Sequence, residues 1–273
     1  MWELIITGCG VSHGTPPWGH PELWSEDPRD HRRRSGAVLR GPDGQVVLID
    51  TGPDLLHQMR DPYKRWDGRS YPVDCITRCD GVLLTHVHAD HSHGINDLRH
   101  LNRLMGGGGI GIHAHAAHLD ELVAMFPYCF ADPDAAYRMG SPALHAVAVR
   151  DDEPFALAGL RITPFAVDHG PAGRVTAWRM GGLAYLTDVK HLPVTADRHL
   201  QDVDLLVLNM LREASHPTHC NWAEAQVLIE RIAPQRTILV HMGHEVRYAQ
   251  WAPRLPPSVR LAVDGLAVQV EAV

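Results

Sequence analysis

The chain has no run of apolar residues long enough to cross a lipid bilayer. A transmembrane helix needs about 20 consecutive apolar residues, and no hydrophobic stretch approaches this length. The start of the chain, Met1-Trp2-Glu3-Leu4, also lacks a positively charged segment followed by a long apolar one, the pattern of a secretory signal. We therefore predict a cytoplasmic protein with no membrane partner.

Cysteine is scarce, which argues against a disulfide framework. The five cysteines, Cys9, Cys75, Cys79, Cys129 and Cys220, are odd in number and scattered along the chain. Domains that depend on disulfides are typically small and dense in cysteine. The sequence therefore predicts reduced thiols.

Positive charge is in deficit, because the formal net charge at pH 7 is -7. A negative net charge opposes the long-range attraction of a polyanion, so a nucleic acid stays open as a partner but is not favoured. The one dense basic run, Arg32–Arg34, lies close to Asp27 and Asp30. A guanidinium matches the geometry of a phosphate. The run is thus a candidate for contacting a substrate phosphate, although we expect at least two of its arginines to be structural or solvated.

Internal repeats, linkers and low-complexity tracts are also missing, so we predict one domain over residues 1–273. With 45% hydrophobic residues the chain can bury a sizeable core. Paired apolar runs interrupted by helical patterns predict an α/β protein in which two sheets share a core and helices cover the outside. The predicted strands are Leu4–Thr7, Ala37–Arg40, Gln45–Asp50, Gly81–Leu84, Arg161–Val167, Val175–Met180, Ala184–Leu186, Leu205–Leu208 and Thr237–Val240. The predicted helices are Asp54–Arg60, Asn96–Met105, Ala116–Met125 and Trp222–Ile232, the last capped by Asn221.

Histidine, in contrast, is abundant, with 20 residues spread along the chain. The most informative segment is an apolar strand that runs directly into His86, His88, Asp90 and His91. Residues two apart in an extended chain face the same side, so His86 and His88 can hold one cation together. A turn into a helix near Asp90 would aim Asp90 and His91 at a second cation. Histidine and carboxylate donors without cysteine suit zinc, manganese, iron or nickel.

Further donors follow other apolar runs. His169, Asp188 and His241 each come directly after such a run. A carboxylate can bridge two cations, and Asp188 is the candidate bridge, with a turn or capping role as its alternative. Asp168 is either a supporting partner of a ligand or solvated. Asp50, at the end of a buried strand, is expected to orient a histidine or to hold a loop.

The run Thr85–His91 resembles the signature of the metallo-β-lactamase superfamily. Four flanking segments are similar to the branch of that superfamily that contains phosphoribosyl 1,2-cyclic phosphate phosphodiesterase. These segments are Gly8–Pro16, Leu48–Asp54, Asn96–Asn102 and His216–His219, and the similarity spans Gly8 to His244. The resemblance implies a four-layer αββα sandwich, with two mixed sheets face to face and helices outside.

The resemblance also implies roles for individual residues. By matching position, His86, His88 and His169 would hold one cation, Asp90, His91 and His241 the other, and Asp188 would lie between them. Asp90 and His219 would be the catalytic residues, with His219 as general acid; simple packing at the start of the following helix is the alternative for His219.

One departure concerns a structural zinc site. Some members of the branch bind such a zinc through cysteines in the early loop and a late histidine. Residues 14–30 here contain no cysteine, although His244 keeps the late position. We therefore expect His244 to hydrogen-bond or to line the pocket instead, and solvated roles for His13 and His20.

These features together predict a hydrolase with two divalent metal ions, manganese or zinc first and iron or nickel as alternatives. The expected substrate is a small or cyclic phosphodiester, such as a ribosyl 1,2-cyclic phosphate, attacked by a metal-activated hydroxide. Hydrolysis of a carbon ester, thioester, lactone or β-lactam, and a nuclease activity, stay open. A di-iron redox protein is less favoured, because the corresponding branch usually has a glutamate where this chain has His88. A non-catalytic metal-binding protein is a third class, and a homodimer is left open.

Overall fold

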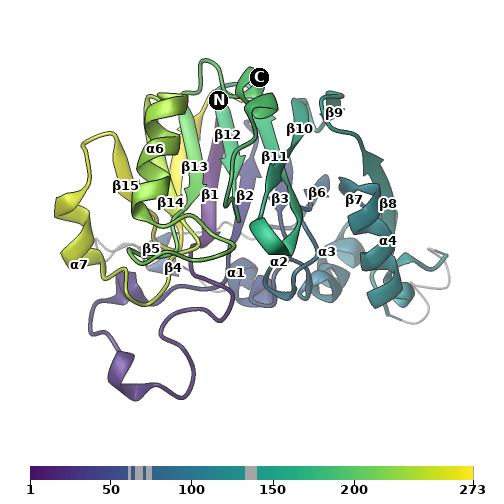
Figure 1. Cartoon of the computed structure of the whole chain (residues 1–273). Helices are drawn as coiled ribbons and strands as arrows, with labels where there is room; N and C mark the ends of the chain where they lie inside the picture. Colours follow the sequence, from purple (N-terminus) through teal and green to yellow (C-terminus); the bar gives the residue numbers. More distant parts are fainter. Residues whose placement is uncertain (61–62, 65–69, 72–75, 133–139, 273) are drawn as a thin grey trace.

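Two large β-sheets pack face to face in the computed structural model, which describes residues 1–60, 63–64, 70–71, 76–132 and 140–272 (Figure 1). In order across the first sheet, the strands are β16 (Leu266–Val270), β1 (Trp2–Gly8), β2 (Gly36–Arg40), β3 (Val46–Ile49), β6 (Gly81–Leu83), β7 (Ile110–His115) and β8 (Leu144–Val149). In the second sheet they are β15 (Val259–Leu261), β14 (Arg236–Val240), β13 (Leu205–Asn209), β12 (Leu183–Leu186), β11 (Arg174–Met180), β10 (Leu160–Asp168) and β9 (Phe155–Leu157). Strands β4 (Tyr63–Lys64) and β5 (Ser70–Tyr71) form a separate small pair.

Each large sheet combines an antiparallel half with a parallel half. Strands β16, β1, β2 and β3 are antiparallel neighbours, whereas β3, β6, β7 and β8 are parallel. In the second sheet β9 to β12 are antiparallel and β12 to β15 are parallel. Both sheets are therefore mixed, as predicted.

Alternate residues of the first sheet face two different cores. Leu4 and Ile6 of β1 pack against the second sheet in the larger core, which also contains Phe165 and Trp178. Ile5, between them in sequence, faces the smaller core under the outer helices. This period-2 alternation is what a strand buried on both faces requires.

Helices cover both outer faces of the two sheets. On the first sheet lie α1 (Leu55–Arg60), α2 (Ala89–Ser92), α3 (Arg99–Leu104) and α4 (Ala116–Met125), while α6 (Trp222–Ile232) and the short α7 (Tyr248–Trp251) accompany the second (Figure 1). The four-layer αββα sandwich expected from the sequence is confirmed. Asn221 caps α6 in a capping box with Glu224, as its position predicted.

Several predicted elements differ in detail. All nine predicted strands are present, but the sheets also contain β7, β8, β9, β15 and β16, which the prediction missed. The predicted helix Asn96–Met105 is instead a 3-10 turn, Ile95–Leu98, followed by α3. The turn at Gly41–Gly44 joins β2 to β3 as a hairpin, with Gly41 N donating to the Gln45 carbonyl at 2.8 Å.

The cysteine prediction holds for the described part of the chain. Cys9, Cys79, Cys129 and Cys220 are free and buried, and Cys75 lies outside the described residues. Among the helices described, none is both long and apolar enough to cross a membrane.

Candidate metal centre

The side chains predicted to bind metal gather at one edge of the sandwich, where strands of both sheets end. His86 and His88 follow β6, Asp90 and His91 lie in α2, His169 follows β10, Asp188 follows β12 and His241 follows β14. Strands β10, β12 and β14 point the same way, so their carboxyl ends meet at one edge and bring distant residues together. A hydrogen bond of 2.9 Å from Thr176 N to the Thr85 carbonyl joins the two sheets at this place.

Three residues at these strand ends have a left-handed backbone. Asp50, Asp188 and His241 have φ angles of 64°, 57° and 56°. A non-glycine residue in this region is strained by about 1 to 3 kcal/mol, and such strain is concentrated at functional sites.

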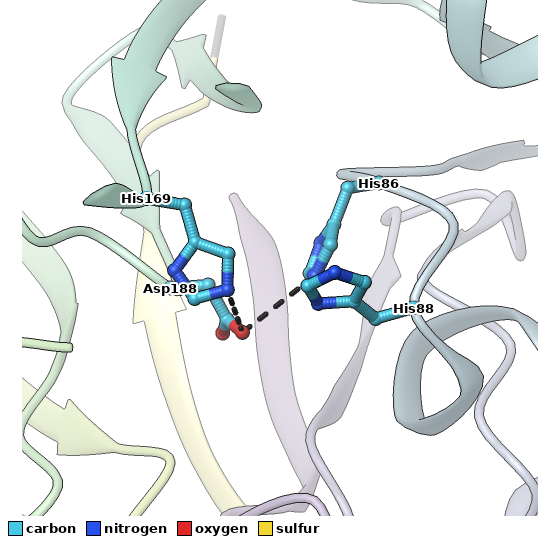
Figure 2. A group of neighbouring side chains, drawn as sticks. All are labelled: His86, His88, His169 and Asp188. Atoms are coloured by element: carbon cyan, nitrogen blue, oxygen red, sulfur yellow. Dashed lines mark ion pairs between the residues drawn. The ribbon is translucent and has the colours of Figure 1, made fainter. Parts of the chain in front are cut away.

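The first group of donors consists of His86, His88, His169 and Asp188, whose ligand atoms all lie within 4.8 Å of one another (Figure 2). The Nε2 atoms of His86 and His169 are each 3.6 Å from Oδ2 of Asp188. Nδ1 of His169 donates to the Thr218 carbonyl at 2.6 Å, which fixes the ring and turns Nε2 toward the group. His88 is the exposed member, and the other three are buried.

The second group consists of Asp90, His91, His241 and the same Asp188, and all four are buried. Nε2 of His91 lies 3.3 Å from Oδ2 of Asp90 and 3.4 Å from Oδ1 of Asp188. Nδ1 of His241 is also 3.4 Å from Oδ1 of Asp188. The two oxygens of Asp188 therefore face different groups, which is the arrangement expected of a bridging carboxylate.

The donor atoms fit divalent cations, because several of them have no partner within the protein. His86 Nε2, His91 Nε2, His241 Nε2 and Asp90 Oδ2 are buried and accept or donate no hydrogen bond among the residues described. A buried polar atom left unsatisfied costs about 1 to 3 kcal/mol. Four such atoms clustered around Asp188 are explained if a ligand satisfies them, and the histidine and carboxylate clusters suit a divalent metal site.

Asp50 holds the second group in place from behind. Its carboxylate accepts from Nδ1 of His91 at 2.6 Å, from Thr85 N at 2.7 Å and from Thr85 Oγ1 at 2.9 Å. Burial raises the pKa of Asp50 above its ordinary value, against the opposing effect of His91. The expectation that Asp50 orients a histidine is thus confirmed, and Asp50 holds Thr85 as well.

Close backbone packing keeps α2 against the loop after β3. Thr51 N donates to the His91 carbonyl at 2.8 Å. A Cβ atom on Gly52 would lie only 2.1 Å from the Asp90 carbonyl oxygen. Glycine at position 52 is therefore needed for the loop to approach the turn that carries Asp90 and His91.

The charges of the two groups are arranged differently. Burial lowers the pKa of His86 well below its ordinary value, and it also lowers that of His169, so these rings are neutral and available as ligands. Burial would lower the pKa of His91 too, but Asp188, Asp90 and Asp50 raise it well above its usual range. Burial would raise the pKa of Asp188, but His241 and His91 hold it well below its ordinary value.

His219 lies between the cluster and an adjoining cavity. Its ring stacks on His169, with centroids 4.8 Å apart, and its Nε2 is 4.0 Å from Oδ2 of Asp188. Burial, followed by the nearby His241, lowers the pKa of His219 to about 3. The cavity has a volume of about 250 Å³, and its lining includes Ser12, His13, Arg212, His216, His219, Gly243, His244 and Glu245.

The basic run of the early loop is occupied by internal contacts. Arg32 is buried, pairs with Asp30 at 3.2 Å and donates to the Val246 carbonyl at 2.6 Å. Arg34 pairs with Asp54 at 2.7 Å, and Arg33 donates to a backbone carbonyl at 3.0 Å. The expectation of structural roles for at least two of the three is confirmed, and none of them lines the cavity beside the cluster.

Three further histidines and one aspartate singled out in the sequence lie outside the two donor groups. His244 lines the cavity, with Nδ1 3.6 Å from Glu245, and His13 lines it as well. His20 is exposed and pairs with Glu22 at 2.8 Å. Asp168 is exposed and accepts from Gly170 N at 2.7 Å, so it holds a turn and does not contact the ring of His169. Within the described ranges, the groups able to hold a metal are the two around Asp188.

Sequence reasoning missed several residues that shape the site. Ser35 Oγ is 2.8 Å from Nδ1 of His241, and the Thr218 carbonyl fixes His169. Arg212 and Glu245 line the cavity. Arg212 comes three residues after β13, so the pattern of a polar residue following a strand, which revealed the metal donors, also points to it.

The chain is similar to one family model and to curated proteins of two kinds. A family model described as "Beta-lactamase superfamily domain" matches residues 45–242. An octanoyltransferase of Porphyromonas gingivalis is 30% identical over 98% of this chain and 52% of its own length. The chain spans about half the length of this relative and of a coenzyme PQQ synthesis protein B of Xanthomonas axonopodis pv. citri, which is 29% identical over 60% of this chain.

Among solved structures, a diphosphatase of the PhnP family is similar over 100% of this chain and 99% of its own, with 29% identity and a TM-score of 0.84. The zinc-bound PqqB of Methylobacterium extorquens covers 98% of this chain and 100% of its own, with 18% identity and a TM-score of 0.71. The latter likeness concerns the fold alone.

Proposed function

The chain belongs to the metallo-β-lactamase superfamily, and from this premise we propose that it hydrolyses a small or cyclic phosphodiester with two divalent metal ions. The family and the donor clusters support the broader conclusion, a metal-dependent hydrolase. The observation that carries the proposal is the shared carboxylate of Asp188, which serves two donor groups beside a cavity that contains His219. The similarity to a PhnP-family diphosphatase favours phosphorus over carbon as the centre attacked.

The seven donors would hold the two cations, His86, His88 and His169 on one side, Asp90, His91 and His241 on the other, and Asp188 between them. When bound, such ions lower the pKa of water toward neutrality and stabilise charge on phosphoryl oxygens. The unpartnered buried nitrogens and oxygen described above are the atoms that would bind them. Manganese and zinc are the proposed metals, because histidine and carboxylate donors suit both.

His219 is the proposed general acid for the leaving oxygen. Its low pKa leaves the imidazole neutral in the free protein at neutral pH. A bound phosphate places negative charge beside the ring, and an opposite charge within a few ångström raises the proton affinity of an imidazole. The ring then takes up a proton in the complex and donates it to the leaving oxygen, as general acids do.

A small substrate is favoured over a nucleic acid. The arginines of the early loop are held by Asp30, Asp54 and a backbone carbonyl, so they do not form a free cationic surface. The cavity of about 250 Å³ is slightly smaller than the usual range for small-molecule sites, about 300 to 1,000 Å³. The cavity also favours an enzyme over a non-catalytic metal-binding protein, because in the latter the metal ligands would be closed off from substrate.

The substrate class is tested with metal-loaded protein on a panel of bis(p-nitrophenyl) phosphate, cyclic phosphates, a lactone and nitrocefin, with added manganese or zinc. We expect turnover of the phosphodiesters. Hydrolysis of the lactone or of nitrocefin without any phosphodiester activity would instead support the carbon-centred alternatives. An iron-dependent visible spectrum together with oxygen uptake would support the redox alternative.

The role of His219 is tested by His219→Ala. We expect turnover to fall by about 10²- to 10⁴-fold, the usual contribution of a general acid, while bound metal per chain stays nearly unchanged. His20→Ala, which removes an exposed imidazole of the early loop, is the matched control and should change neither quantity. Metal loss in His219→Ala as large as the loss of turnover would make His219 a ligand.

A further inference from the structure

We propose that a second cavity, at the end of the second sheet opposite the metal cluster, binds a phosphate group, supplied either by free phosphate or by a phosphomonoester. The cavity has a volume of about 190 Å³, and its lining includes Leu205, Arg236, Ile238, Ser258 and Arg260. It lies where β13, β14 and β15 begin, whereas the metal donor His241 follows the end of β14. A strand rises by about 3.3 Å per residue, so about 16 Å separates Arg236 from His241. The inference is therefore independent of the proposed hydrolase reaction.

The strand register places two arginines on one face of the sheet. Residues two apart in a strand face the same side, so Arg236 and Ile238 point the same way. Ile238 is the register partner of Arg260 in the neighbouring parallel strand, so Arg260 faces this side as well. Leu205 of β13 is the register partner of Arg236. The two guanidiniums therefore share a cavity with the apolar side chains of Leu205 and Ile238.

The positive charge of Arg260 has no acidic partner among the described residues. Its side chain makes no ion pair or hydrogen bond with them. Burial, followed by the like charge of Arg236, lowers the pKa of Arg260 below its ordinary value. Arg236 itself donates from Nη2 to the neutral Gln269 carbonyl at 3.3 Å. Arg254, by contrast, is exposed and pairs with Glu213 at 2.6 Å. A bound anion would supply the negative charge that this pair of arginines lacks.

The backbone around the cavity is held in place before any ligand binds. Thr237 N donates to the Ser258 carbonyl at 2.8 Å, which ties the segment before β15 to β14. Val259 N donates to the Pro256 carbonyl at 2.9 Å, and Pro257 further restricts this turn. The Ser258 hydroxyl is thereby fixed at the cavity as a third donor. A preformed site of this kind loses little freedom when an anion binds.

The donors match a phosphate better than a carboxylate. A guanidinium presents a planar fork of donors that fits two phosphate oxygens, and charge-assisted bonds of this type are stronger than neutral ones. A phosphate dianion balances both arginines and has further oxygens for the Ser258 hydroxyl, whereas a carboxylate has one charge and two oxygens. At about 30 Å³ per water, the cavity holds about six waters, which is room for one phosphate group. The rest of a larger ester would extend into solvent.

Binding is measured by NMR on zinc-loaded protein labelled with ¹⁵N in arginine. The Nε–H signal of each arginine reports on its own surroundings, so phosphate at this cavity is distinguished from phosphate at the metal ions. Inorganic phosphate is titrated at constant ionic strength. We expect the signals of Arg236 and Arg260 to shift together and to saturate at about 1 mM or below, the affinity that two charge-assisted hydrogen bonds supply.

Three variants test whether the two arginines act together. Arg260→Gln should weaken the response of Arg236 to phosphate by about 10- to 100-fold, and Arg260→Lys should restore part of it. Arg150→Gln removes the same charge from an exposed arginine that follows β8, at the other side of the sandwich, and should leave the titration unchanged. Both replaced arginines are exposed, so the variants should keep the fold.

Two esters distinguish the sources of the phosphate. Binding of inorganic phosphate but not of methyl phosphate would identify free phosphate as the ligand. Equal or tighter binding of methyl phosphate would identify the head group of a monoester. Dimethyl phosphate has a single charge and should bind more weakly than either. The proposal is overturned by a response of Arg260 that does not saturate, by a response that chloride reproduces, or by a response of Arg236 that Arg260→Gln leaves unchanged.

Discussion

The two halves of the donor cluster share Asp188 but differ in burial and charge. The half formed by His86, His88 and His169 brings three imidazoles, one of them exposed. The half formed by Asp90, His91 and His241 is wholly buried and adds a second carboxylate. Because a buried carboxylate and fixed ligands strengthen the binding of a divalent cation, we expect the second half to hold its ion more tightly.

The residues that hold the histidines in place also differ between the two halves. His91 is held by the buried carboxylate of Asp50, and His241 by the hydroxyl of Ser35. His169 is held by a backbone carbonyl in the segment that also carries His219. The second half is thus anchored in the core of the sheets, while the first half is linked to the cavity. The two halves therefore differ both in how firmly their side chains are held and in how close they lie to the cavity.

The largest expected effect on metal binding and activity comes from replacing Asp188, the carboxylate that both halves share. Asp188→Asn keeps the shape of the side chain, and asparagine tolerates the left-handed backbone at this position. Loss of the bridging charge should release both ions and lower activity by about a thousandfold or more, since metal ions supply several kcal/mol of transition-state stabilisation. Metal analysis together with the phosphodiester assay measures both. One firmly retained ion per chain would show that Asp188 is not the bridge.

A pair of alanine variants tests the difference between the halves directly. His88→Ala should leave about one ion per chain and a nearly unchanged melting temperature, because His88 is exposed. His241→Ala should lose the ion of the second half and also destabilise the fold by about 2 kcal/mol or more, because it leaves a cavity in a fully buried site. Metal content and thermal unfolding of the metal-free proteins distinguish them. Equal unfolding temperatures of the two metal-free variants would show that the second half is not anchored more firmly than the first.

A smaller effect on metal binding is expected from replacing Asp50, whose carboxylate holds His91 of the second half. Asp50→Asn should weaken metal binding there by about 10- to 100-fold, the usual cost of changing a group that orients a ligand. The ion of the first half should be weakened less, since Asp50 reaches His86 only through Thr85, whose Oγ1 lies 3.0 Å from His86 Nδ1, and does not contact His169. Stepwise chelation, followed by metal analysis, measures the two affinities separately. If both ions are lost together, the halves do not bind independently.

Much of this cluster could be predicted because its donors follow a simple pattern. His86, Asp188 and His241 each come at or just after the end of an apolar strand, so the sequence indicated that these side chains lie at the ends of strands. Arg212 and Glu245 were not predicted, because an arginine does not bind a metal ion and Glu245 does not directly follow an apolar run. Their importance depends on which loops meet around the cavity, and this is decided by tertiary packing.

The fold was also only partly predictable. The missed strands lie at or near the margins of the sheets, where β9 and β15 have only three residues each. Strand β7 has the sequence IGIHAH, in which glycine and histidine obscure the alternation of buried and half-buried residues. Such short or diluted patterns acquire strand structure from their neighbours, because pairing and packing outweigh local preference.

The smallest expected effect comes from outside the cluster, at Asp264, which supports only the second half. Asp264 accepts from Cys9 N at 3.0 Å and from Arg33 N at 2.7 Å. The Cys9 carbonyl in turn accepts from Met242 N at 2.9 Å, next to His241. Burial raises the pKa of Asp264 to about 6, above the value of about 3.9 expected in the unfolded chain.

The sign of the pH dependence follows from this raised pKa. Below about pH 4 the Asp264 carboxyl is protonated in both states, whereas above pH 6 the folded protein must bury a charge that the unfolded chain leaves in water. The stability contributed at this position should therefore fall by about 1 to 2 kcal/mol as the pH rises from 4 to 6, with allowance for partial exposure. Asp264→Asn should remove this slope, measured as the difference between urea unfolding of the two metal-free proteins. A difference that stays constant over this pH range would show that Asp264 does not titrate there, and would leave the anchoring of the second half to Asp50 and Ser35.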